Sequence, residues 1–84
     1  MTVGTHVKLL KSLIGVVHGT QGVIDYISPK LVWVAWDLPG RPLPEGYNKW
    51  DARAYTLFHF RREAFEPDEA REMLEPLPDA QTIQ

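Results

Sequence analysis

The chain has 84 residues, which is the length of one small domain and leaves no room for a second hydrophobic core. Hydrophobic residues make up 44% and charged residues 24%, a balance that is typical of a folded chain and excludes a disordered one. Cysteine is absent, which excludes disulfides, thiolate metal sites and a cysteine nucleophile. The sequence has no apolar run near the roughly 18 residues of a membrane span and no secretory signal, so we expect a cytoplasmic protein without membrane contact.

The net charge of −2 conceals two oppositely charged segments. Residues 1–62 carry eight of the nine lysines and arginines but only four acidic residues, a balance of +4. Residues 63–84 carry Arg71 and seven acidic residues, a balance of −6. The simplest interpretation of this acidic tail is a solvated helix face. The alternatives are that it covers the basic body or mimics a polyanion.

Alternation of polar and apolar residues predicts the first strands. Residues 5–10 alternate in this way, and residues 23–27 form a second strand after a glycine-rich turn. Residues 31–37 give the strongest strand signal, with Trp36 on one face and Trp33 on the other. The short link between the second and third strands predicts a hairpin.

The regular pattern then stops. Residues 38–51 contain three prolines and two glycines, and so long a loop in a small domain is usually functional or mobile. Strand character returns at residues 54–60. Residues 61–65 are interpreted as a single helical turn followed by a short last strand.

The end of the chain predicts an acidic helix over residues 67–77. Pro67 suits the first helical position, acidic residues follow it in the first turn, and an apolar stripe has helical spacing. We expect this helix to pack on the strands of residues 1–66, and we expect residues 78–84 to form a flexible tail. Four or five short strands bury one face most economically as a small, bent antiparallel barrel. The side chains expected in its core are Val7, Leu9, Ile24, Val32, Val34, Trp36, Leu57 and Phe65.

A family resemblance rests on three short motifs. These are Gly4, Val7 and Leu9, then Gly19, Thr20, Gly22 and Ile24, then Val32, Val34, Trp36 and Asp37. Over residues 3–37 the pattern resembles the small Src-homology-3-like barrels, including KOW-type modules. The resemblance implies a mainly β fold, an antiparallel barrel of about five strands, and the residues themselves add the short C-terminal α-helix. It implies no particular function, because such barrels bind RNA, DNA, peptides and proteins. The Pro-rich insertion and the acidic tail depart from the pattern.

The sequence offers no recognisable catalytic or metal-binding motif. His6, His18 and His59 lack the spacing of a metal site, and a nucleophile elbow, a P-loop and a dinucleotide fingerprint are all missing. We therefore expect a chain that is not an enzyme and uses no metal or cofactor. The sequence leaves one enzyme alternative open, a symmetric oligomer with an active site at its centre. The sequence does not predict an oligomeric state.

The aromatic residues point instead to recognition of a partner. Tryptophan and tyrosine combine a large contact area with a polar group and recur as hot spots of binding. The interpretation that we favour is a non-catalytic protein-binding module that acts through the Pro-rich loop and its aromatic and basic neighbours. The residues predicted to contact the partner are Trp33, Arg41, Tyr47, Lys49, Trp50, Arg53 and Tyr55.

A nucleic-acid-binding barrel is the main alternative. Trp33 or Trp50 would then stack on bases. The basic residues that would contact phosphates are Lys8, Lys11, Lys30, Arg41, Lys49 and Arg53. The small positive balance of the body and the acidic tail argue against it. A weaker alternative is an acidic nucleic-acid mimic that occupies a basic site on a regulator.

Overall fold

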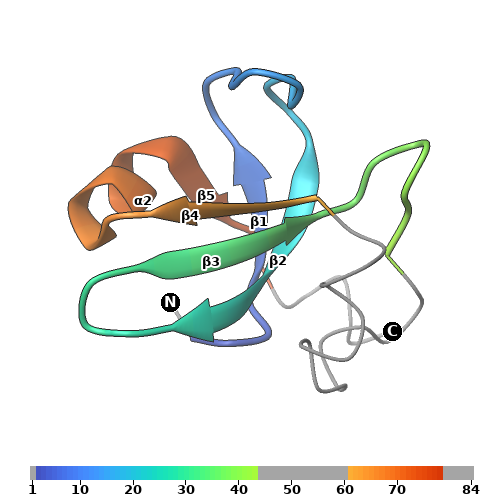
Figure 1. Cartoon of the computed structure of the whole chain (residues 1–84). Coiled ribbons are helices and arrows are strands. Elements are labelled where there is room, and N and C mark those ends of the chain that lie inside the picture. The colour runs from blue at the N-terminus through green and yellow to red at the C-terminus, as the bar shows by residue number, and fades with distance from the viewer. Residues whose placement is uncertain (1, 44–60, 79–84) are drawn as a thin grey trace.

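The computed structural model describes residues 2–43 and 61–78 (Figure 1). Within these residues the chain forms one antiparallel sheet of five strands and a short helix. The elements are β1 (His6–Leu9), β2 (Gln21–Ile27), β3 (Val32–Trp36), β4 (Arg62–Phe65), α2 (Pro67–Met73) and β5 (Leu74–Pro76). The predicted mainly β class is therefore confirmed.

The strands lie in the order β4-β3-β2-β1-β5, which is compatible with a Src-homology-3-like fold. Figure 1 shows β3 and β4 running across the direction of β1, so the sheet is strongly curled. Within the described part of the chain, β4 and β5 are the two edges and are not paired with each other. Closure into a barrel is therefore still a prediction.

The curl of the sheet has a local origin in β2. The register with β3 shifts between Ile24 and Tyr26, so that β2 carries one extra residue, Asp25, at a β-bulge. Such a β-bulge bends its strand and increases the local twist. The bulge also sets the direction of the Asp25 side chain, which is buried.

The core lies on the concave face of the curled sheet. Seven of the predicted core residues are described, and all seven are buried: Val7, Leu9, Ile24, Val32, Val34, Trp36 and Phe65. The eighth, Leu57, lies outside the described residues. The rings of Trp36 and Phe65 meet edge to face, with centroids 6.4 Å apart, an arrangement that aromatic pairs favour. The helix adds Ala70 to the same core.

Two predictions about the C-terminal part are wrong. The short last strand predicted within residues 61–65 is present as residues 62–65, but the helical turn predicted before it is absent, because these residues already pair with β3 in the register Trp33↔Ala64. The helix ends at Met73, four residues before the predicted end, because the next residues turn extended and pair with β1 as β5. The acidic segment is thus both a helix and an edge strand of the sheet. The strand predicted at 54–60 lies outside the described residues.

Candidate functional site

Trp33 is only partly exposed, because β4 places an arginine over its ring. The guanidinium carbon of Arg62 lies 4.6 Å from the ring centroid. The same guanidinium donates two hydrogen bonds of 2.8 Å, from Nε and Nη2, to the carboxylate of Asp25. The Asp25 side chain is 1% exposed, so this bidentate pair is well shielded from water. One face of the Trp33 ring is therefore covered by a cation and is not free to stack on a ligand.

Arg41 is exposed in a tight turn that follows β3. Its backbone N–H donates to the carbonyl of Leu38 at 3.0 Å, and Asp37 Oδ1 accepts a hydrogen bond from the Leu43 N–H. Within the described residues, no hydrogen bond, ion pair or cation–π contact joins Arg41 to Trp33. The other predicted contact residues, Tyr47, Lys49, Trp50, Arg53 and Tyr55, lie outside the described residues. The structure thus places two of the seven and does not bring those two together.

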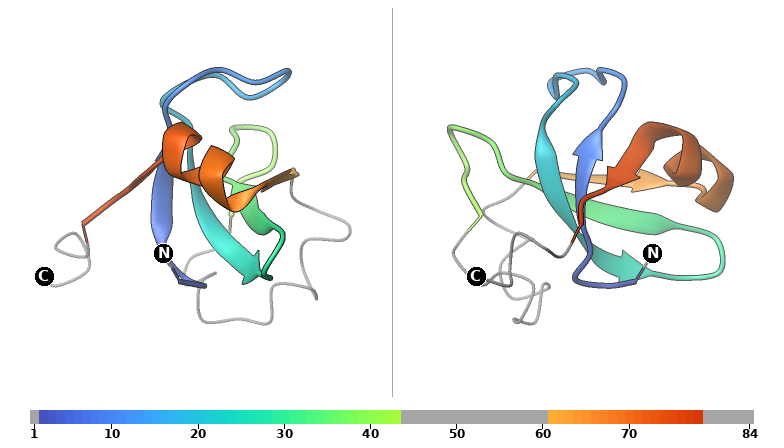
Figure 2. Two further views of the ribbon diagram at one scale, coloured as in Figure 1. Left: turned by 90° about the vertical axis from the view of Figure 1, so that its left-hand side faces the viewer. Right: turned by 180° about the vertical axis from the view of Figure 1, so that it is seen from behind.

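A feature that we did not predict is the loop between β1 and β2, which we call the β1–β2 arm (residues 10–20). It rises beyond the sheet as an ordered excursion (Figures 1 and 2). Leu13 and Val16 exchange two backbone hydrogen bonds of 2.8 and 3.1 Å, and the Ser12 hydroxyl accepts one from the His18 N–H. Gly15 has a φ of +82°, which suits the third position of such a turn. These bonds give the arm a defined backbone.

The arm exposes aliphatic side chains at its tip and along its sides. Ile14 is 93% exposed, Val17 is 63% exposed and Leu10 is 46% exposed. Arg61 Nη2 donates a 2.7 Å hydrogen bond to the Ile14 carbonyl oxygen, which fixes the tip to the start of β4. Val16 is buried in the core and anchors the arm from below. The structure therefore holds Ile14 in one place while leaving its side chain in water.

The sequence contains a signal that would have indicated this arm. Residues 10–17 hold five aliphatic residues around one glycine, without strand alternation, and a turn needs no such apolar content. The sequence does not show how many of these five residues are buried. The fold buries Val16 and partly buries Leu13.

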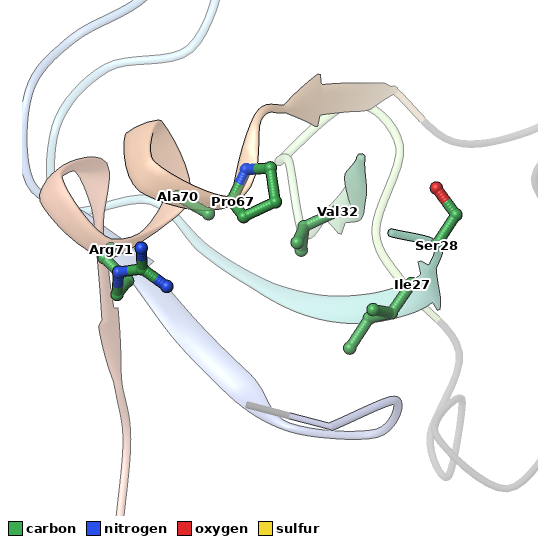
Figure 3. Close-up of a pocket in the computed structure, with 6 residues that line it drawn as sticks. All are labelled: Ile27, Ser28, Val32, Pro67, Ala70 and Arg71. Carbon is green, nitrogen blue, oxygen red and sulfur yellow. The ribbon is translucent and has the colours of Figure 1, made fainter. Parts of the chain in front are cut away.

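A hollow of about 270 Å³ lies between α2 and the turn that joins β2 to β3 (Figure 3). We call it the α2 hollow. It is lined by Ile27, Ser28, Val32, Pro67, Ala70 and Arg71. Its two polar side chains already have partners. The Ser28 hydroxyl accepts hydrogen bonds from the backbone N–H groups of Lys30 and Leu31, and Arg71 pairs with Asp68. The hollow is therefore chiefly an apolar surface.

The basic side chains are mostly neutralised by neighbours. Among the seven that the structure describes, four form ion pairs: Lys8 with Glu75, Arg61 with Glu63, Arg62 with Asp25 and Arg71 with Asp68. The three described basic residues without an ion pair are Lys11, Lys30 and Arg41, which lie on three different loops. These three residues therefore form no continuous basic stripe within the described part of the chain.

Residues 2–43 and 61–78 offer neither a metal site nor a membrane-spanning helix. They contain no group of three or more histidine, cysteine, aspartate or glutamate side chains that could hold a metal ion. None of the helical structure in this part is long and apolar enough to cross a membrane. Comparison of the whole chain with protein-family models, with curated proteins and with solved structures gives no match.

Proposed function

We propose that the chain is a non-catalytic protein-binding module built on a Src-homology-3-like barrel. The observation that carries the proposal is Ile14, which is 93% exposed on a tip fixed by Arg61 and by its own turn. An exposed aliphatic side chain contributes nothing to the core of its own fold, and the arm exposes three of them, Leu10, Ile14 and Val17, within eight residues. A backbone that is already ordered also loses little entropy on binding. The β1–β2 arm is therefore added to the Pro-rich loop face as a contact surface.

The distribution of charge supports a protein partner over a nucleic acid. Phosphate binding draws its affinity from several basic side chains that act together. Here four of the described basic side chains are engaged with carboxylates, and the α2 segment presents an acidic surface. The ring of Trp33 beneath Arg62 is also a poor platform for stacking on a base. Nucleic-acid binding is therefore the competing outcome of the experiment.

The experiment is affinity capture from a lysate of the native host, with the full chain immobilised and half of the lysate treated with nuclease. Ile14→Asp is expected to abolish capture of a protein partner, with or without nuclease, while circular dichroism shows an unchanged fold. Val3→Asp is the matched control, since Val3 is also an exposed aliphatic residue at 58% and does not belong to the arm. Trp50→Ala and Tyr47→Ala test the loop face in the same way. Capture that is lost on nuclease treatment and is unchanged by Ile14→Asp contradicts the proposal.

A further inference from the structure

The chemistry of the α2 hollow defines what fits it. Its walls are apolar, and its serine and arginine are already engaged. Around the hollow, the exposed carboxylates of Asp68, Glu69 and Glu72 on α2 outnumber two cations, Arg71 in the lining and Lys30 on the β2–β3 turn. This excess of negative charge disfavours an anionic ligand and favours an apolar group flanked by positive charge. The hollow therefore favours an aliphatic side chain that is carried on a basic segment.

The β1–β2 arm of the same protein has these properties. Its tip is the aliphatic side chain of Ile14, and Lys11 and His18 are exposed on either side of it along the chain. Residues 10–20 contain no acidic residue. The arm and the hollow are thus complementary both in apolar character and in charge.

Within one molecule the two surfaces stay apart. Arg61 binds the tip of the arm just before β4 begins, whereas Pro67 lines the hollow just after β4 ends. The base of the arm meets α2, where the Leu10 N–H donates to the Met73 carbonyl oxygen at 2.8 Å, but the tip of the arm projects away from the helix (Figure 2). Both surfaces of one copy are therefore open to other molecules.

We propose that Ile14 of one copy inserts into the α2 hollow of a second copy, so that this protein associates head to tail. The inference rests on the proposed function, because it names a second copy of the chain as a partner of the β1–β2 arm. A contact between two different surfaces is heterologous, so each copy has one arm and one hollow to offer and the assembly is a ring or an open chain. The contact area is small, and we expect a weak association that is weakened further by salt.

The test is sedimentation velocity of the purified full chain from micromolar to millimolar concentration. The wild type is expected to associate as its concentration rises. Ile14→Asp removes the inserted side chain and places a carboxylate beside acidic α2, and Ile27→Lys places a cation in the hollow opposite the basic arm. Each variant is expected to raise the dissociation constant at least about tenfold, the effect of losing one well-buried aliphatic contact. Val3→Asp and Tyr26→Lys are the matched controls, because both side chains are exposed and neither belongs to the arm or lines the hollow.

A mixture of the two variants gives the sharpest test. Ile14→Asp keeps an intact hollow, and Ile27→Lys keeps an intact arm. The equimolar mixture is therefore expected to form a one-to-one dimer and nothing larger, at concentrations where each variant alone stays monomeric. If the arms met each other symmetrically, Ile27→Lys would associate like the wild type, and that result would overturn the proposal. A mixture that stays monomeric would overturn it too.

A dilution series of amide NMR spectra of the wild type needs no variant and covers the case in which Ile27→Lys does not fold. We expect concentration-dependent changes in amide chemical shift at residues 11–18, 27–32 and 67–71, and none elsewhere. A wild type that remains monomeric at every concentration overturns the head-to-tail contact. If Ile14→Asp nevertheless abolishes capture of a host protein, the proposed function stands without the head-to-tail contact.

Discussion

The β1–β2 arm and the α2–β5 segment are two excursions from the same sheet, and they treat their aliphatic residues in opposite ways. The α2–β5 segment buries Ala70 and Leu74 and presents carboxylates to water. The arm buries Val16 but leaves Ile14 and Val17 exposed, with no acidic residue among residues 10–20. The first arrangement lowers the free energy of the folded monomer, whereas the second leaves apolar area that only association can remove from water.

The two segments are also held in place by different forces. The α2–β5 segment is fixed by burial and by strand pairing with β1, including Leu9↔Leu74. The arm is held by a local turn, by Val16 and partly buried Leu13, by backbone hydrogen bonds at its base and by the hydrogen bond from Arg61. Substitutions in the first segment should therefore change the stability of the whole fold, and substitutions in the arm should change binding.

The largest effect is expected from Leu74→Ala. Leu74 is 2% exposed and fills the core at the start of β5, so its truncation leaves a cavity and should cost about 2–5 kcal/mol of unfolding free energy. Urea denaturation followed by tryptophan fluorescence measures this loss. Leu77→Ala is the control, since Leu77 is only partly buried. Equal losses of unfolding free energy in the two variants would contradict this structure, because they would mean that Leu77 is buried as fully as Leu74.

Glycine substitutions are expected to give the next largest loss of stability, and they distinguish backbone strain from steric crowding. Gly15→Ala places a side chain at φ +82° and 2.5 Å from Arg61 Nη1, so it should cost roughly 1–2 kcal/mol for the left-handed backbone and disturb Arg61 as well. Gly19→Ala meets the same backbone strain at φ +89° with open space around it. Gly40→Ala meets neither and should be nearly neutral. The expected order of midpoint shifts in thermal unfolding is therefore Gly15, then Gly19, then Gly40, and any other order contradicts the geometry of the arm.

Arg61→Ala should have a smaller effect on global stability, about 0.5–1.5 kcal/mol for the hydrogen bond to the Ile14 carbonyl, because the partly exposed ion pair with Glu63 adds little. Its specific consequence is local, because the Ile14 carbonyl loses its partner. Hydrogen exchange of the arm amides should accelerate, while exchange in β3 changes only as global stability does. Arg71→Ala is the control, since it removes an exposed ion pair within α2 and should leave the arm unaffected. An unchanged arm in Arg61→Ala would show that the turn alone fixes the tip.

The smallest effect on stability is expected from Ile14→Ser. A residue that is 93% exposed makes little contribution to the core, so the unfolding free energy should stay within about 0.5 kcal/mol of the wild type. Val16→Ser, two residues away, places a hydroxyl in the core and should be strongly destabilising. Measuring both by chemical denaturation tests the division of the arm into an anchor and an exposed tip. A marked loss of stability in Ile14→Ser would mean that the tip packs on its own molecule.

The strands and most of the core were predictable, because alternation along a strand directly indicates which side chains avoid water. The cluster of Trp33, Arg62 and Asp25 was not, because Asp25 and Arg62 are 37 residues apart and meet only when β2, β3 and β4 align around the bulge. Of the predicted partner surface, the structure describes Trp33 and Arg41 alone. Exposure of Ile14 was not predictable either, because an aliphatic residue beside a glycine is equally compatible with a buried turn.

The local pattern of residues was enough to predict that this chain buries one face of several short antiparallel strands, because that information repeats every second residue. Two features follow from the assembled fold alone: residues 74–76 leave the helix to pair with β1, and Ile14 stays in water. Both outcomes depend on which strand edge and which core space are still available once the sheet has curled. Such availability is a property of the whole fold, and the local pattern of side chains does not contain it.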